Sequence, residues 1–307
     1  MRNFTFKGLL LTAVFMLLGC LSIQAANDDL ITKQITINLD KAGTLPNKIA
    51  SSEMYKITNL KIVGEINGTD WNMIREMAGR NYQESSTEGN LSVLDLSEAK
   101  IVAGGDYYYY DNLFNNKVYT SNDEIGEYAF AYCSGLTSLT LPVGITSIGE
   151  FAFSGCSGLT SLTRPAGITS IGEYAFYGCS GLTSLTLPAG ITWIGESAFS
   201  YCSGLTSIYV YAEKVPRIGR YAFEGCASRK CTLYVPKGTY DNYRLSEFGY
   251  FENIVEFDAT GIDKTTTSTD VEEVSRYSLN GQRLVGPTKG LNIVKYSDGS
   301  VKKVAVE

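Results

Sequence analysis

The 307-residue sequence contains no histidine. Histidine is the side chain that most often acts as a general base, as the partner of a catalytic nucleophile and as a metal ligand. Its absence therefore excludes the commonest arrangements for each of these tasks. We expect no catalytic residue, no metal site and no cofactor, and hence a protein that is not an enzyme.

Positive charge is also scarce, because 26 Lys and Arg residues stand against 32 Asp and Glu residues, giving a net charge of −6. Nucleic acids and anionic membranes attract basic surfaces, so this balance argues against both as partners. After the first 25 residues no apolar stretch reaches the length of a membrane-spanning helix. We expect no transmembrane span in the mature chain.

Residues 1–25 have the composition of a signal peptide. Arg2 and Lys7 form the positive flank, an apolar run follows, and Ala25 is a small residue suited to cleavage. A Leu-Gly-Cys step ending at Cys20 resembles a lipoprotein site, so lipidation is the alternative to simple cleavage. In both cases we expect export from the cytoplasm.

The strongest feature of the sequence is an internal repeat. The motif Ile-Gly-Glu-Tyr-Ala-Phe, or a close variant, starts at Ile125, Ile148, Ile171, Ile194 and Ile218. A Cys follows in each unit, and then a segment of the form Leu-Thr-Ser-Leu-Thr-Leu-Pro or a variant of it. A period in the low twenties with Leu-x-x-Leu-x-Leu is the signature of leucine-rich repeats.

Each unit contains one predicted strand. Leu185 and Leu187 alternate with Ser184 and Thr186, which is the period of a half-buried strand, and Pro188 ends it. One unit cannot bury its apolar side alone, so the units must stack. The sequence predicts a leucine-rich-repeat solenoid with a parallel β ladder and short helical or irregular outer segments, capped at both ends.

The flanking regions are less regular. We expect an N-terminal cap and degenerate repeats over residues 26–124, and the regular repeats with a C-terminal cap over 125–257. A Thr-rich linker is expected over residues 258–275. Asn280-Gly281 between alternating residues indicates a hairpin, so we expect a small β tail over 276–307.

The exposed side of the predicted ladder is the first candidate binding site. Strands in neighbouring repeats lie about 4.8 Å apart, so equivalent residues form columns. The two polar columns are Ser138, Ser161, Ser184 and Ser207, and Thr140, Thr163, Thr186 and Tyr209. These residues either recognise a partner or merely solvate an exposed sheet.

Four consecutive tyrosines form the second candidate site: Tyr107, Tyr108, Tyr109 and Tyr110. We expect them in a loop, since Gly104-Gly105 precedes them and Asp111-Asn112 follows. Tyrosine combines a large apolar ring with a polar tip and suits contact surfaces. The tyrosines form an aromatic patch for a protein or glycan, or two of them cap the first repeat.

Two further columns recur once per repeat. The cysteines are expected to be buried free thiols that satisfy backbone groups, and Cys226 with Cys231 is the one pair that could form a disulfide. The glutamates are expected to form a solvated column on the outer side, with a divalent-cation stripe as the alternative. Their equivalent surroundings do not supply the two different pKa values that acid/base catalysis needs. The glutamates are Glu127, Glu150, Glu173 and Glu196.

The motif Ile-Gly-x-x-Ala-Phe-x-x-Cys, followed by Leu-Thr-Ser-Leu-Thr-Leu-Pro, resembles the BspA-like leucine-rich-repeat family of bacterial surface and secreted proteins. The tail, with Leu279-Asn280-Gly281-Gln282-Arg283, looks like the C-terminal sorting or anchoring modules of exported proteins in Gram-negative bacteria.

This resemblance implies secretion or display on the outer cell surface. It also implies adhesion to a host matrix protein, another cell-surface protein or a glycan. The alternative function is a structural envelope or spacer protein without a specific host ligand.

Overall fold

The structure, a computed structural model, describes residues 29–113, 115–163 and 166–259, together with four strands of the C-terminal tail. The chain divides into two compact units, Met1–Ala259 and Thr260–Glu307. The expected signal peptide, residues 1–25, lies outside the described residues, as does most of the expected linker.

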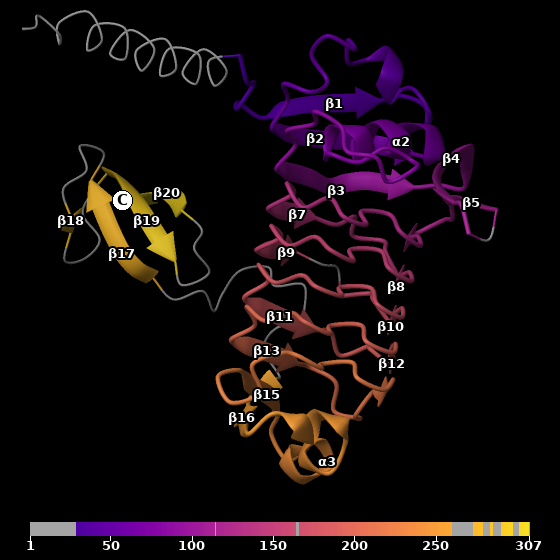
Figure 1. The fold of residues 1–307 in the computed structure, drawn as a ribbon. Helices are drawn as coiled ribbons and strands as arrows, with labels where there is room; N and C mark the ends of the chain where they lie inside the picture. The colour runs from indigo at the N-terminus through magenta and orange to yellow at the C-terminus, as the bar shows by residue number, and fades with distance from the viewer. Residues whose placement is uncertain are drawn as a thin grey trace, which may run out of the picture. The chain divides into compact units, whose positions relative to one another are not determined.

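The first unit is a solenoid with parallel strands stacked along one side, called the strand face (Figure 1). These strands form two sheets, in the orders β1-β2-β3-β7-β9 and β11-β13-β15-β16. The prediction of a leucine-rich-repeat solenoid is confirmed. The strands are β1 (Ile35–Leu39), β2 (Asn59–Ile66), β3 (Val93–Ile101), β7 (Ser138–Thr140), β9 (Ser161–Thr163), β11 (Ser184–Leu187), β13 (Ser207–Val210), β15 (Thr232–Pro236) and β16 (Asn253–Phe257).

A third sheet, of two-residue strands in the order β14-β12-β10-β8-β6, runs along another side. Four of these five strands bury their isoleucine and leave their first residue at the surface. The exception is β14, whose isoleucine is half-buried. The strands are β6 (Glu124–Ile125), β8 (Ser147–Ile148), β10 (Ser170–Ile171), β12 (Trp193–Ile194) and β14 (Arg217–Ile218).

After each short strand the chain forms an irregular stretch that we call the outer segment: residues 126–133, 149–156, 172–179, 195–202 and 219–226. At each of the four junctions between neighbouring outer segments, three N–H groups donate to carbonyls of the following segment. The first junction has the bonds Tyr128 N to Glu150 O, Phe130 N to Ala152 O, and Tyr132 N to Ser154 O. The first donor of each segment has a left-handed backbone, with φ of 56° at Tyr128.

A column of stacked phenylalanines forms the centre of the core. Neighbouring rings lie 5.0–5.5 Å apart between centroids and are nearly parallel, with interplanar angles of 5–13°. All of these rings are buried. The column therefore joins every repeat to the next through the same contact. It consists of Phe130, Phe153, Phe176, Phe199 and Phe223.

The cysteine column also joins neighbouring repeats. The Cys156 thiol donates to the carbonyl of Phe130 at 3.0 Å, and the next three cysteines repeat this bond at 3.1–3.2 Å. The six cysteines from Cys133 to Cys231 are buried free thiols, which confirms the prediction for the column. Cys226 and Cys231 are also both free, so the disulfide considered for them is not formed.

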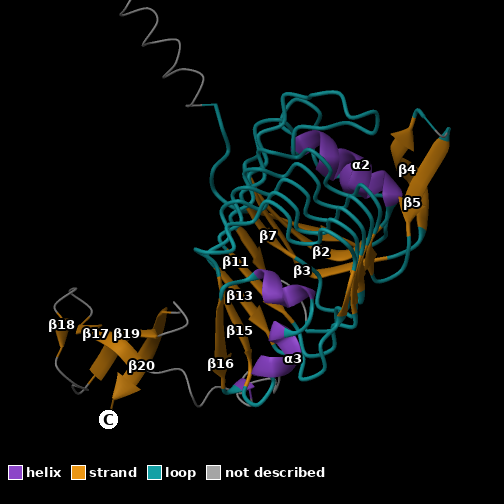
Figure 2. Cartoon of the chain, turned by 60° about the horizontal axis from the view of Figure 1, so that its bottom comes forward, coloured by secondary structure: helices purple, strands orange, loops and turns teal. Residues whose placement is uncertain are grey.

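The N-terminal cap contains η1 (Leu45–Asn47), α2 (Gly68–Met77) and a hairpin of β4 (Gly104–Asp111) and β5 (Asn116–Thr120). A capping box begins α2, because the Asn67 side chain accepts from the helix backbone and Asp70 accepts from Asn67 N. Figure 2 shows α2 and the hairpin at the N-terminal end of the coil. The expectation that the four tyrosines lie in a loop is wrong, since they are part of β4.

The C-terminal cap contains α3 (Tyr240–Arg244) and η2 (Glu247–Tyr250). Phe248 and Phe251 are buried against Phe223, with ring centroids 5.5 and 5.2 Å away. The Tyr243 ring is also buried, and its hydroxyl donates to the carbonyl of Ala212 at 2.6 Å. The last ring of the phenylalanine column is thereby shielded from water.

The second unit contains a four-stranded antiparallel sheet in the order β18-β17-β19-β20. Its strands are β17 (Glu273–Ser278), β18 (Arg283–Leu284), β19 (Gly290–Tyr296) and β20 (Val301–Val306). In the described parts of both units, no helix combines the length and the apolar composition needed to cross a membrane.

Candidate binding surface

The structure pairs the predicted polar residues in register within each of the two sheets of the strand face. Parallel pairing places Ser138 opposite Ser161 and Thr140 opposite Thr163. It also places Ser184 opposite Ser207 and Thr186 opposite Tyr209. These side chains are exposed or half-buried, apart from Thr163, whose side chain lies outside the described residues.

In the middle of the face, the described strand residues carry hydroxyl groups and no charge. Ser207 Oγ donates to Ser184 Oγ at 3.0 Å, so neighbouring rungs are bonded through their side chains as well as their backbones. Threonines at the start of the strands bond to backbone carbonyls instead, as Thr206 Oγ1 does to Thr183 O at 3.0 Å. The hydroxyl groups available to a partner are therefore those of the two polar columns, and not those of the threonines that precede each strand.

An aromatic cluster follows at the C-terminal end of the face. The rings of Tyr209 and Tyr234 are stacked, with centroids 4.4 Å apart and planes 5° apart. Phe257 meets Tyr209 and Tyr211 edge to face, at 6.1 and 5.1 Å. All four rings are only half-buried. Burial, followed by the neighbouring Tyr234, raises the pKa of Tyr209, so its hydroxyl is neutral over the physiological range.

Sequence reasoning included Tyr209 in the candidate site but missed the other three rings of this cluster. The register pairs Tyr209 with Tyr234 although they are 25 residues apart, two more than the 23-residue period. The alternating segment Leu233-Tyr234-Val235 was the available signal, because it places the tyrosine on the same face as Tyr209.

Charged residues occupy the N-terminal end of the face. Lys61 Nζ lies 2.6 Å from Glu98 Oε1 and 3.5 Å from Asp95 Oδ2. The hydrogen bond to Glu98 raises the pKa of Lys61. For Asp95, burial acts to raise the pKa, but hydrogen bonds from Ser97 and the charge of Lys61 outweigh it, and the pKa is lowered. The face thus changes from charged through hydroxylic to aromatic along the solenoid.

The four-tyrosine site is split by the structure. Tyr108 and Tyr109 are buried, with 1% and 6% of their surface exposed, so neither can contact a partner at the surface. Tyr108 donates to the carbonyl of Glu127 at 2.8 Å, and the Tyr109 ring stacks on Tyr128 at 4.1 Å. The candidate binding role is therefore corrected for these two residues, which cap the first repeat instead.

Tyr107 and Tyr110 stay half-buried on the other side of the hairpin. The Tyr107 ring lies 5.4 Å from Tyr82 and 6.3 Å from Tyr119, and Lys117 Nζ lies 4.7 Å from its centroid. This small aromatic cluster belongs to the N-terminal cap and does not continue the strand face.

The glutamate column lies on the outer side, half-buried or exposed. Burial, together with the charges of Glu127 and Glu173, raises the pKa of Glu150. Among the described residues, no group of three or more His, Cys, Asp or Glu side chains is arranged to hold a metal ion. The cation stripe considered from the sequence therefore gains no support from the geometry.

Comparison with known proteins gives a family match. The model of the BspA-type leucine-rich-repeat region matches residues 104–242 in six copies. No curated protein matches the chain.

Solved structures of leucine-rich-repeat proteins are similar to this chain. The T. pallidum leucine-rich-repeat protein is 30% identical, with a TM-score of 0.37, over 45% of this chain. The chain spans 64% of the length of that protein. A leucine-rich cell-surface protein of Faecalibacterium prausnitzii is 22% identical over 66% of this chain and 58% of its own length, with a TM-score of 0.34.

The pneumococcal vaccine antigen PcpA is 14% identical over 66% of this chain and 69% of its own, with a TM-score of 0.36. The family match rests on the six matched copies of the repeat. Residues 104–242 therefore carry repeats of the BspA leucine-rich type.

Proposed function

We propose that the chain is a secreted or surface-displayed binding protein that recognises a protein or glycan partner through the strand face. It would act by adhesion and without catalysing a reaction. The observation that carries the proposal is the two blocks of in-register hydroxyls, on β7–β9 and on β11–β13, together with the half-buried cluster of Tyr209, Tyr211, Tyr234 and Phe257. Buried contact surfaces are enriched in tyrosine and depleted in charge.

Export is part of the proposal. It is supported by the signal-like composition of residues 1–25 and by the kinship of the repeat region with BspA-type proteins. Display on the outer surface of a Gram-negative bacterium is the expected destination. The tail sheet is the candidate sorting or anchoring module.

The proposal is tested by a binding screen of residues 26–307 against immobilised matrix proteins, plasma proteins and glycans. Any saturable hit is repeated with the double variants Ser184→Lys/Thr186→Lys and Tyr209→Ala/Tyr234→Ala. Because a well-packed aromatic contact contributes about 2 kcal/mol or more, we expect at least about a 30-fold loss of affinity. Glu173→Lys, on the outer side, is the matched control and should bind normally.

Two outcomes oppose the proposal. If the folded chain binds nothing in the screen, the result favours the structural envelope or spacer role. If binding occurs but both double variants bind normally, the strand face is not the recognition surface. Circular dichroism of each variant establishes that a loss of binding is not a loss of folding.

A further inference from the structure

The last outer segment, residues 219–226, ends the array with unpaired backbone donors. At the four junctions before it, every set of three N–H groups reaches carbonyls of the following segment, with N to O distances of 2.6–3.0 Å. Between residue 226 and residue 259, where the description of the first unit ends, no further outer segment follows. Within the described part of the chain, no acceptor receives a hydrogen bond from the corresponding N–H groups of Tyr221, Phe223 and Gly225.

The neighbouring short strand is open in the same direction. β14 is the terminal strand of its sheet. The carbonyl of Ile194 accepts from Gly219 in the following repeat at 2.7 Å, whereas the equivalent carbonyl of Ile218 has no strand beyond it. The edge thus presents one acceptor followed by three donors, in the order that another repeat would use. Tyr221 and Gly225 are exposed, so a partner can reach this edge from solvent. Backbone N–H and C=O groups are nearly always paired in proteins, with other protein groups or with water.

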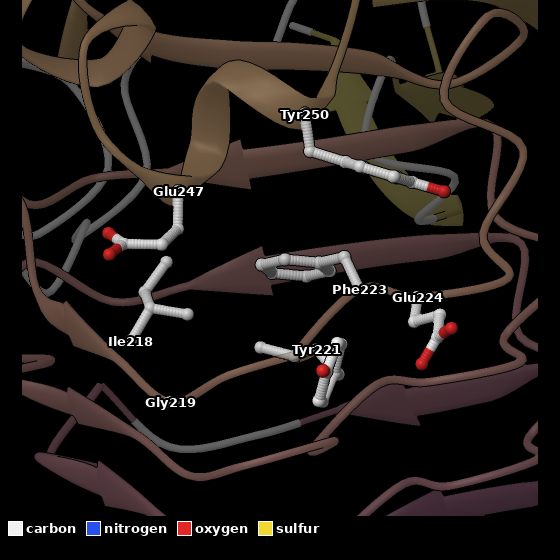
Figure 3. A pocket seen from close by; sticks show the side chains of 8 residues that line it. Ile218, Gly219, Tyr221, Phe223, Glu224, Glu247 and Tyr250 are labelled. Atoms are coloured by element: carbon white, nitrogen blue, oxygen red, sulfur yellow. The ribbon is translucent and has the colours of Figure 1, made fainter.

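A cavity of about 290 Å³ lies beside this edge, between the last outer segment and η2. Figure 3 shows Tyr250 on the opposite side of the cavity from Tyr221 and Phe223, with Glu247 beside Ile218. Tyr221 is 62% exposed and Tyr250 43%, so two large rings face solvent here. The aromatic walls suit one apolar side chain of a ligand.

Two carboxylates beside the cavity indicate which kind of ligand it can bind. Glu224 and Glu247 both line the cavity and are exposed. In the described part of the chain neither forms an ion pair. Two carboxylates repel an anion that the three N–H groups could otherwise attract. They favour a neutral acceptor, such as a peptide carbonyl, that carries a basic side chain nearby.

We propose that this edge is a docking site for an extended peptide segment of another protein, which adds one more repeat-like strand to the outer side. Its carbonyls accept from Tyr221, Phe223 and Gly225. One of its apolar side chains enters the cavity, and a basic side chain faces Glu224 and Glu247. Main-chain pairing gives such a complex its affinity, and the cavity and the two carboxylates give it specificity.

A second copy of this chain does not fit the edge. Two of the three complementary carbonyls of the first outer segment are already occupied by side chains of the cap: Glu127 O accepts from Tyr108, and Ala129 O from Trp71 and Arg75. Two C-terminal ends brought together would place N–H groups opposite N–H groups. The occupant is therefore a different polypeptide.

The test uses the full mature chain and a capped synthetic peptide with the sequence of residues 148–155, Ile-Gly-Glu-Phe-Ala-Phe-Ser-Gly, carrying Glu150→Lys. In the free protein, the amide hydrogens of Tyr221, Phe223 and Gly225 should exchange much faster than those of Ser197, Phe199 and Tyr201. The peptide should slow exchange of the first three at least about tenfold. The unmodified peptide should bind more weakly, because its glutamate meets two others.

The protein variant Glu224→Lys/Glu247→Lys should weaken binding of the lysine peptide at least about tenfold, because attraction becomes repulsion. Glu53→Lys is the matched control. The strand-face variant Ser184→Lys/Thr186→Lys should bind this peptide normally, so failure here is distinguishable from failure of the strand-face proposal. Peptide binding that leaves the three amides unprotected, or no binding at millimolar peptide, would overturn the inference.

Discussion

The two ends of the array of outer segments are closed in different ways. At the N-terminal end, three side chains of the cap donate to two of the three free carbonyls of the first segment: Tyr108, Trp71 and Arg75, with bonds of 2.8–3.0 Å to Glu127 O and Ala129 O. At the C-terminal end, Phe248 and Phe251 cover the last phenylalanine ring. They offer no acceptor to the N–H groups beside it.

This difference shows that a cap at the end of a solenoid has two separate roles. One is to cover the apolar core, and both caps do so. The other is to satisfy a backbone edge, which is made of carbonyls at one end and of N–H groups at the other. Arginine, tryptophan and tyrosine can donate to carbonyls without leaving an apolar setting. The C-terminal cap covers the apolar core but leaves the backbone N–H groups of the last outer segment without acceptors.

The largest expected effect comes from removing the ring that covers the C-terminal end. Phe248→Ala should lower the free energy of unfolding by about 3–5 kcal/mol, since the ring is buried against Phe223 and Tyr243. Urea denaturation measures it. The neighbouring Leu245, 84% exposed, is the control, and its change to Ala should cost less than about 0.5 kcal/mol. Equal losses of stability in the two variants would mean that the Phe248 ring does not stabilise the C-terminal cap.

Arg75→Met tests the donor role at the N-terminal end. The guanidinium is buried and donates to carbonyls of the first outer segment, so its loss removes charge-assisted hydrogen bonds between the cap and this segment and should cost about 2–3 kcal/mol. Arg229→Met, which removes an exposed ion pair with Glu252, should cost less than about 1 kcal/mol. Comparable losses in the two urea curves would contradict the donor role.

Tyr108→Phe isolates one hydrogen bond of the same end. The ring stays in the core, while the hydroxyl that donates to Glu127 O is lost, at an expected cost of about 1–2 kcal/mol. Tyr107→Phe, on the half-buried side of the hairpin, is the control and should change stability by less than about 0.5 kcal/mol. A cost confined to Tyr108 confirms the division of the four tyrosines.

The smallest effect is expected between the two ends, at Glu150. Its pKa is raised by burial and by Glu127 and Glu173, so the folded chain holds this proton at a higher pH than the unfolded chain does. Stability is therefore lost as pH rises from the ordinary glutamate pKa through the raised one. Glu150→Gln should melt at a higher temperature than the parent at pH 7. The gain should fade at low pH, and a constant gain would exclude titration as its cause.

Much of the fold could be predicted from the sequence, because the same pattern of apolar, polar and cysteine positions recurs in each repeat. The alternation around Leu185 places the hydroxyl columns, and the cysteine position gives the buried thiols. Gly149 shows what the pattern does not reveal. A Cβ there would lie 2.7 Å from the Glu127 backbone nitrogen, so glycine is required by the close approach of neighbouring repeats. That approach exists only in the stacked structure.

The candidate site was less predictable. Four identical tyrosines carry no alternation of apolar and polar residues, so the sequence could not tell strand from loop or buried ring from exposed ring. The aromatic cluster of the strand face depends on a register that departs from the regular period between Tyr209 and Tyr234. The unpaired edge depends on the directions of the backbone N–H and C=O groups. The side chains of residues 219–226 do not indicate these directions.

The uniform direction of the hydrogen bonds between outer segments gives this side of the solenoid an electric polarity. Each peptide group has a dipole of about 3.5 D, and groups aligned head to tail add, as they do in an α-helix. Here the N–H groups point toward the C-terminal end, so the positive pole lies at Tyr221, Phe223 and Gly225. An α-helix has its positive pole at its N-terminus. In this chain the outer side has it at the opposite end, where the last repeat meets solvent.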